Sequence, residues 1–121
     1  SLNEIVQLVG MDALSAPDRL KLEAARSIRE DFLHQNSFHE IDTYTSLRKQ
    51  FLMMKLVLAF YDESRKALEN GANVQGLIKM AVREKIGRFK YVTDDEIERE
   101  YEAVKEELGK EIDDVLRRED F

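Results

Sequence analysis

The 121-residue sequence contains no cysteine or tryptophan, one proline and five glycines. Without cysteine the chain can form no disulfide framework, no cysteine-ligated zinc site and no thiol nucleophile. The scarcity of proline and glycine favours helices joined by short connections. The longest apolar run, 51–61, is interrupted only by Lys55. It is much shorter than the roughly 20 residues of a membrane-spanning helix, so it predicts a buried core helix and no direct membrane insertion.

The sequence also lacks the motifs of common catalytic sites. It has neither a G-x-x-x-x-G-K-[ST] phosphate loop nor a G-x-S-x-G nucleophile elbow. It opens Ser1-Leu2-Asn3, with no initiator methionine and no basic stretch leading into an apolar one. We therefore expect a fragment of a longer protein that has no signal peptide and no catalytic residues of its own.

What the chain does contain is 43% apolar and 36% charged residues with a net charge of -6, which indicates one domain with a real core. The acidic balance argues against a nucleic-acid partner. One basic segment stands out, consisting of Arg83, Lys85, Arg88 and Lys90 with Phe89 and Tyr91 between them. We expect these cations to make intramolecular or subunit contacts, with the acidic end of the chain as an obvious neighbour.

Helical periodicity and capping signals predict an all-α fold, a helical bundle with a long acidic C-terminal helix. The expected segments are 2–9, ended by Gly10; a helix capped by Ser15 and fading near Asn36; a central helix from Ser46 to Gly71; short helices over 74–80 and 82–90; and a last helix after a Thr93–Glu96 capping box.

The same periodicity predicts core faces. In the helix after Ser15 the expected stripe is Ala25, Ile28 and Phe32, widened by Leu22 and Leu33. In the central helix, a set of apolar residues steps by fours and threes: Leu47, Phe51, Met54, Leu58, Tyr61 and Leu68. Because Leu52, Leu56 and Phe60 make this helix apolar nearly all round, we expect it to lie at the centre of the bundle.

The last helix differs from the rest in charge. Residues 94–121 hold 13 acidic and 5 basic side chains, whereas residues 1–93 hold 12 and 14. Its apolar positions form one narrow seam, consisting of Ile97, Tyr101, Val104, Leu108 and Ile112. The helix either packs on its own bundle or meets a partner. We divide the single domain into a bundle over 1–93 and an acidic helix over 94–121.

Two groups of residues in the connection before the central helix are candidate sites. His34, His39, Glu40 and Asp42 are the only cluster of metal-ligand types. A gap of five residues does not place both histidines on one helical face, so we expect no metal site. Phe38 and Tyr44 put aromatic rings into a polar connection, where they form either a core contact or a binding surface.

Three stretches resemble the C-terminal region of the catalytic alpha chain of archaeal-type ATP synthases, which are also called A-type or V-type. They are 4–10 (EIVQLVG), 28–33 (IREDFL) running into 38–44 (FHEIDTY), and 82–86 (VREKI) with 90–91 (KY). The resemblance covers residues 4 to about 91 in the family's order. Two positions depart from it: Ala81 replaces a common proline, and Leu47-Arg48 replaces a Pro-Glu type helix start.

The resemblance implies the helical domain of an archaeal catalytic chain that couples ATP synthesis or hydrolysis to proton or sodium transport. The phosphate loop and the magnesium ligands of that family lie upstream, so ATP or ADP with Mg would bind mainly outside this fragment, which needs no cofactor. Phe38 matches the family's phenylalanine against the adenine, and Tyr44 is a second candidate contact. An aromatic ring stacks on a purine without strong base selectivity.

The implied partners are the B-type (beta) chains, which alternate with the alpha chains in the A/B ring, and a central stalk subunit. The implied location is cytoplasmic, peripheral on the inner face of the cell membrane within the ATP synthase complex. An alternative function from a different class is a free-standing helical protein-interaction module with no nucleotide role.

Overall fold

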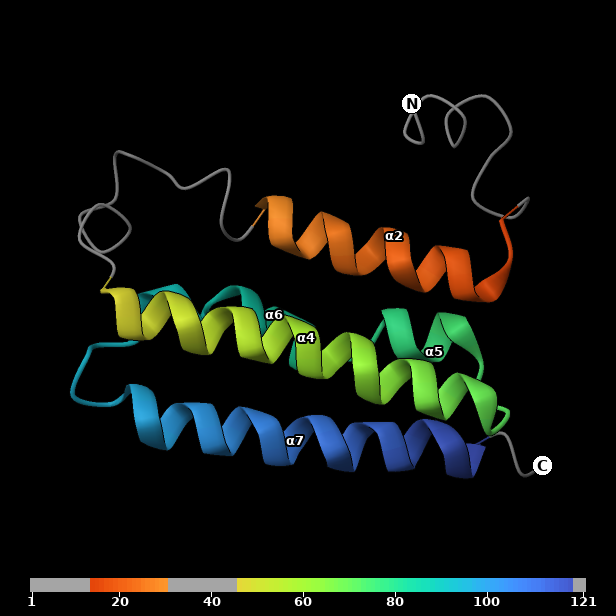
Figure 1. Ribbon diagram of the computed structural model, residues 1–121. Helices are drawn as coiled ribbons and strands as arrows, with labels where there is room; N and C mark the ends of the chain where they lie inside the picture. Colours follow the sequence, from red (N-terminus) through yellow and green to blue (C-terminus); the bar gives the residue numbers. More distant parts are fainter. Residues whose placement is uncertain (1–13, 31–45, 119–121) are drawn as a thin grey trace.

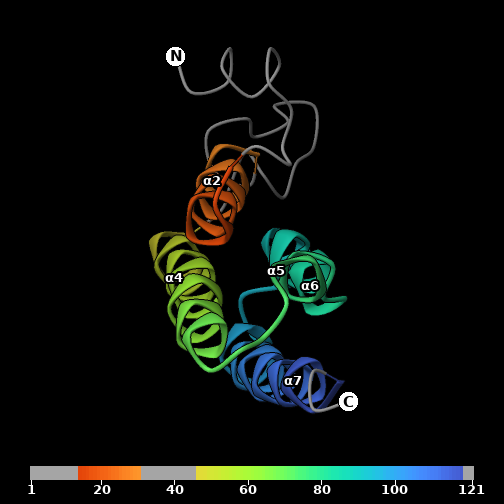
Figure 2. The same ribbon diagram turned by 90° about the vertical axis from the view of Figure 1, so that its right-hand side faces the viewer.

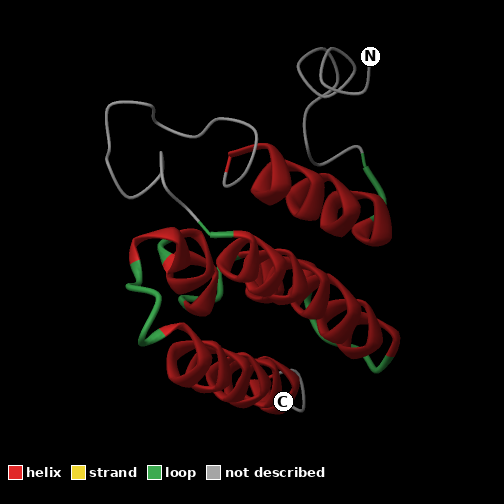
Figure 3. Ribbon diagram, turned by 60° about the vertical axis from the view of Figure 1, so that its left-hand side comes forward, coloured by secondary structure: helices red, strands yellow, loops and turns green. Residues whose placement is uncertain are grey.

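A computed structural model describes residues 14–30 and 46–118, and all regular structure in these ranges is helical (Figure 3). The elements are α2 (Ala16–Ile28), α4 (Leu47–Glu69), α5 (Val74–Ile78), α6 (Val82–Gly87), the 3₁₀ helix η3 (Phe89–Tyr91) and α7 (Ile97–Arg118). The all-α fold class is confirmed. The helix predicted over 2–9 lies outside the described residues.

Helix α4 lies between α2 and α7 and contacts both (Figure 1). Seen from the end, these three helices form an arc, and α5 and α6 lie on its inner side (Figure 2). Helix α5 packs against α2 and α7, and α6 packs against α4 and α7. The short helices therefore link the two outer helices of the arc, and α4 has the central place that its composition predicted.

Several predicted helix ends are confirmed at the atomic level. The hydroxyl oxygen of Ser15 accepts from the backbone N–H of Asp18 at 3.3 Å, and that of Ser46 accepts from Lys49 N–H at 3.1 Å. After α4, Gly71 adopts a φ of 97°, the left-handed conformation that glycine accepts most easily. Helix α7 begins at Ile97, later than the Thr93 capping box predicted, because 94–96 form a turn.

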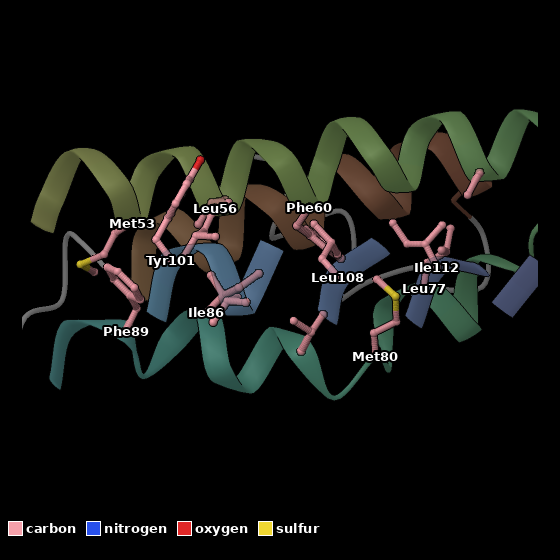
Figure 4. Packing of buried hydrophobic residues seen from close by; sticks show 14 of the residues in the cluster. Met53, Leu56, Phe60, Leu77, Met80, Ile86, Phe89, Tyr101, Leu108 and Ile112 are labelled. Atoms are coloured by element: carbon pink, nitrogen blue, oxygen red, sulfur yellow. The ribbon is translucent and has the colours of Figure 1, made fainter. Parts of the chain in front are cut away.

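The core runs along the inner face of α4 (Figure 4). Met53 and Phe89 pack at one end, and Leu77, Met80 and Ile112 lie at the other (Figure 4). Burying a side chain of this size stabilises the fold by about 1.5–3 kcal/mol, so contacts between sequence-distant elements hold the arc together. The largest side chains exposed by less than 2% are Phe60, Phe89, Leu20, Leu52, Met53, Leu56, Leu77, Leu108, Val57, Val82, Val104 and Val115.

The apolar set of α4 that steps from Leu47 to Leu68 is not its most buried face. Leu47, Phe51 and Leu58 are 83%, 54% and 53% exposed, while Met54, Tyr61 and Leu68 are half-buried. The buried face carries the other apolar set, which consists of Leu52, Met53, Leu56, Val57, Phe60 and Ala67. Both sets have helical spacing. The side on which α2, α6 and α7 pack decides which set is buried.

The predicted core stripe of α2 was wrong at Ala25, whereas Ile28 does pack against the core. The buried residues are Leu20, Glu23 and Ala24, whereas Ala25 is exposed and Leu22 and Ile28 are half-buried. Phe32 and Leu33 lie outside the described residues. The true contact face is rotated about the helix axis from the predicted one, and it includes a carboxylate.

The seam of α7 is confirmed. Ile97, Tyr101, Val104, Leu108 and Ile112 are all buried, and Val115 extends the seam by one turn. The charged side chains leave only one apolar stripe on this helix, so its periodicity identified the packed face without ambiguity. Among the described helices, none is long and apolar enough to cross a membrane.

Candidate functional site

The candidate adenine contacts Phe38 and Tyr44 lie outside the described residues, as do His34, His39, Glu40 and Asp42. The structure does describe the helices on both sides of this segment. Helix α2 ends at Ile28 and α4 begins at Leu47, and the two helices pack side by side (Figure 1). The contacts at these two helix ends set the positions between which the segment runs.

Arg83, in α6, holds the C-terminal half of α2. Its Nη1 donates to Oε2 of Glu23 at 3.2 Å and to the carbonyl oxygen of Ile78 at 3.0 Å. Its Nη2 donates to Oγ of Ser27 at 2.9 Å and to the Glu23 carbonyl at 3.4 Å. The guanidinium also lies 4.9 Å from the centre of the Phe60 ring. One side chain therefore contacts α2, α4 and the end of α5.

The carboxylate that Arg83 binds is itself buried. Glu23 has a side chain only 8% exposed, and Arg26 on the same helix reaches it at 3.6 Å. Burying a carboxylate costs free energy unless the group is paired with a cation and hydrogen-bonded. Glu23 can therefore be buried only where Arg83 reaches it, and this restricts how α2 packs. The guanidinium fork fixes both position and angle. This ion pair makes α2 a defined part of the bundle.

A second set of contacts holds the start of α4. Oγ of Ser46 accepts from Lys49 N–H and donates to Oδ1 of Asp94 at 3.1 Å. Lys49 is buried, and its ammonium donates to the carbonyl oxygen of Lys90 at 3.2 Å, with Oδ1 of Asp94 3.9 Å away. These bonds attach the first turn of α4 to η3 and to the turn before α7.

A neighbouring residue of α4 continues this attachment. Arg48 makes a bidentate contact with Glu98 of α7, with Nε to Oε1 at 2.7 Å and Nη2 to Oε2 at 3.0 Å. The hydrogen bonds from Arg48 hold the pKa of Glu98 below its usual range, and the same contact raises the pKa of Arg48. Both groups are exposed, so the pair sets orientation more than it stabilises the fold.

Helices α6 and α7 are joined by two further contacts. Oε1 of Glu111 accepts from the backbone N–H of Val82 at 3.1 Å and so caps α6, for which Ala81 provides no side-chain cap. Lys85 donates to Oε1 of Glu107 at 2.9 Å, which raises the pKa of Lys85. The expected contact between the basic segment and the acidic helix is therefore found at Lys85, whereas Arg83 pairs with α2.

The sequence did not identify Lys49, Glu111 or the partner of Arg83. The available signal for Lys49 was its position two helical turns before Leu56, which places it on the same face as the buried leucine. Among the described residues, no group of three or more His, Asp or Glu side chains is placed to hold a metal ion. The hydrogen bonds of Arg83, Ser46 and Lys49 hold the two helix ends that flank the segment 31–45.

The comparisons with known proteins agree on one family. Residues 1–78 match the family described as the C-terminal domain of V and A type ATP synthase. The chain is similar to proteins named V-type ATP synthase alpha chain. It is 54% identical to that of Acetivibrio thermocellus over 118 residues, 53% to that of Clostridioides difficile over 117, and 57% to that of Thermoanaerobacter pseudethanolicus over 117.

These similarities cover 97–98% of the chain, including α7, but only 19–20% of each relative. The chain thus spans about a fifth of the length of the curated relatives that it matches. All three relatives are bacterial, so the archaeal source implied by the resemblance is not supported.

Proposed function

Because the chain belongs to the family of C-terminal domains of V- and A-type ATP synthases, we propose that it contributes an adenine contact and couples nucleotide state to the central stalk. The contact is Phe38, with Tyr44 as a second contact or a support for the segment. The segment 31–45 joins α2 to α4, and both of these helices are firmly attached to the bundle. This double anchoring is the observation that carries the proposal.

The anchors explain how an aromatic ring in a connection could be held against a base. Arg83 fixes α2 two turns before the segment, and Ser46 and Lys49 fix α4 directly after it. Binding residues commonly lie on loops positioned by rigid elements. Stacking on the ring would bind adenine and exclude water without reading the base strongly.

The same anchors offer a path for coupling. A displacement of the segment acts on α2 and on the start of α4, and these connect to α6 and α7 through Arg83 and Arg48. The bundle would then move as one body between two positions, one for each nucleotide state. We propose that its far end presses on the central stalk, and that 1–93 and 94–121 act as one domain.

At the level of the whole alpha chain, the activity is ATP synthesis or hydrolysis coupled to proton or sodium transport. ATP or ADP with Mg binds mainly in the part of the alpha chain upstream of these residues. The beta chains of the ring and a central stalk subunit are the partners, within a complex located on the cytoplasmic face of the membrane. The 121 residues themselves provide no catalytic residue.

The test is Phe38→Ala in the full-length alpha chain within the assembled ring. Base–aromatic stacking is worth about 1–3 kcal/mol, so affinity for ATP and ADP should fall by about one to two powers of ten. Guanine nucleotides should lose a similar factor. Nucleotide titration provides the measurement, and Phe38→Tyr, which keeps the aromatic face, should retain most of the affinity.

Thermal or denaturant unfolding of the same variants separates binding from packing. If Phe38 is a core residue, its replacement by alanine should cost about 3–5 kcal/mol of stability. A large loss of stability with unchanged affinity would reject the adenine contact and favour the alternative, a helical interaction module with no nucleotide role.

A further inference from the structure

The connection that follows α4 contains the one Asn-Gly pair of the sequence, Asn70-Gly71. Both residues are exposed, and no atom of the described residues lies within 4 Å of the position that a side chain would take at Gly71. Asparagine is among the chemically labile residues of proteins. It is especially labile before glycine, because glycine has no side chain to hinder the approach of its backbone nitrogen to the asparagine amide. The pair is therefore a reactive point on the surface of the bundle.

The reaction open to this pair is deamidation through a cyclic imide. The backbone nitrogen of Gly71 forms a bond to Cγ of Asn70 and loses its proton, while the bond from Cγ to Nδ2 breaks and the amide nitrogen leaves as ammonia. Water then opens the five-membered imide at one of its two carbonyl groups. The product at position 70 is aspartate or isoaspartate, in which the main chain runs through the side-chain carbons.

In the folded structure both reacting groups are hydrogen-bonded. The N–H of Gly71 donates to the carbonyl oxygen of Leu68 at 3.1 Å, and Nδ2 of Asn70 donates to the carbonyl oxygen of Lys66 at 3.0 Å. Asn70 has a φ of -96° and a ψ of 15°. The nitrogen of Gly71 reaches Cγ only after ψ rotates far from this value. The C-terminal cap of α4 thus holds the pair in an unreactive conformation.

We propose that Asn70 is a site of spontaneous deamidation whose rate is set by opening of the last turn of α4. The turn is closed by the hydrogen bond from the N–H of Ala72 to the carbonyl oxygen of Ala67 at 3.0 Å, and Leu68 packs half-buried against the core. Helix ends are among the segments that open most readily. Each opening frees both reacting groups and lets ψ rotate, so the modification accumulates with the age of the protein.

Either product weakens the connection between α4 and α5. Aspartate lacks the amide donor to Lys66 and adds a negative charge beside Glu69, at the helix end where the dipole favours cations. Isoaspartate adds one carbon to the main chain and displaces the N–H groups of Gly71 and Ala72 from their acceptors. Because α5 follows this turn and packs against both α2 and α7, the modification acts on the packing of the bundle.

The experiment follows deamidation in the full-length alpha chain and in a synthetic peptide of residues 66–75, which is too short to hold a stable helix. Both are kept at mildly alkaline pH, and mass spectrometry of tryptic fragments measures conversion at Asn70. We expect conversion about ten- to a hundredfold more slowly in the folded chain than in the peptide. Asn73, which precedes the branched Val74, is the internal control and should stay intact.

Two results would overturn the proposal. The first is an equal rate at Asn70 in the folded chain and in the peptide, which would show that the cap gives no protection. The second is the absence of conversion in the folded chain after about a hundred half-times of the peptide reaction, which would show that the turn does not open.

A matched pair of variants tests whether opening of the turn limits the rate. Leu68→Ala removes packing at the turn and should speed deamidation at Asn70 by at least about threefold in the folded chain, and not in the peptide. Val92→Ala is the control, since Val92 is also half-buried against the core but directly precedes α7, which begins at the opposite end of the bundle (Figure 1). An unchanged rate in Leu68→Ala would contradict the proposal.

The consequence of the modification is tested with Asn70→Asp. Amides of 67–72 in the full-length alpha chain should exchange with deuterium at least about threefold faster than in the wild type. Asn73→Asp adds the same charge but keeps the oxygen that accepts from the N–H of Gln75 at 2.8 Å, so it should leave this exchange unchanged. Equal exchange in Asn70→Asp and the wild type would contradict the stated effect. No readout depends on nucleotide affinity, so this proposal and the adenine contact can fail separately.

Discussion

Arg83 donates a hydrogen bond from Nη1 to Oε2 of Glu23 at 3.2 Å, and so joins two helices whose pairing residues are 60 positions apart in the sequence. Around it, the same guanidinium binds Ser27 and the Ile78 carbonyl and lies over the Phe60 ring. This contact places α2, and with it the entry to the segment 31–45. Arg83, in the stretch 82–86 (VREKI), therefore fixes the position of α2, a role that the sequence motif alone did not specify.

Replacing Arg83 should cost stability because it leaves a buried carboxylate without its main partner. We expect Arg83→Met to lower the free energy of unfolding by about 3 kcal/mol. This is the lower end of the range for breaking a buried ion pair, because Arg26 still reaches Glu23. Denaturant unfolding is the measurement. Arg88→Met, at a side chain 73% exposed, should change stability by less than about 0.5 kcal/mol.

The double variant Glu23→Leu with Arg83→Met gives a further check. It removes the uncompensated charge and should recover most of the loss. A single Arg83→Met variant as stable as the wild type would contradict the assigned role.

The two faces of α4 can be compared with one substitution. Leu56 is fully buried and Leu58 is 53% exposed. In the 121-residue chain, Leu56→Ala should destabilise by about 2–5 kcal/mol, through lost burial and the cavity left behind. Leu58→Ala should cost about 1 kcal/mol or less, since about half of its surface stays in water and no closed cavity is left behind. Denaturant unfolding of both variants tests this, and equal losses would show that the assigned core face is wrong.

The contact between Arg48 and Glu98 should depend on pH. Hydrogen bonds from Arg48 lower the pKa of Glu98 in the folded state, so its stabilising contribution is present above the ordinary pKa of a glutamate and is lost as the pH falls through the lowered value. Thermal unfolding of the wild type and Glu98→Gln from about pH 7 to about pH 3 is the measurement. The wild type should be more stable at neutral pH, and the difference should shrink on acidification. A constant difference would argue against the ion pair.

Helix α7 should open more readily than α4. It contacts α4, α5 and α6 through the single seam from Ile97 to Val115, whereas α4 lies between the outer helices and contacts α2, α6, η3 and α7. Opening α7 separates it from one side of the bundle, whereas opening α4 breaks contacts on both of its sides, so the amides of α7 should exchange faster in native-state hydrogen exchange. Protection of 104–112 equal to that of 52–60 would contradict the prediction.

The sequence predicted well wherever the determining contacts are local. Ser15 and Ser46 cap their helices because a cap needs only the N–H groups two or three residues ahead. The periodicity of α7 identified its buried seam because the rest of the helix surface is rich in charged residues. The site was predicted less completely. Phe38 and Tyr44 stood out as aromatic rings in a polar connection, the family resemblance gave them the adenine role, and both stay predictions because they lie outside the described residues. Lys49, Glu111 and the Arg83–Glu23 pair were not foreseen, since each depends on a distant partner.

The amino-acid sequence by itself therefore determined the all-α class, the approximate helix limits and the packed face of α7. Only the tertiary structure decided which face of α4 is buried and which carboxylate Arg83 binds. The physical reason is that helical periodicity shows which residues share a face but, on a helix apolar on both sides, cannot choose between the faces. That choice depends on where α2 and α7 pack, and the same packing brings Glu23 to Arg83.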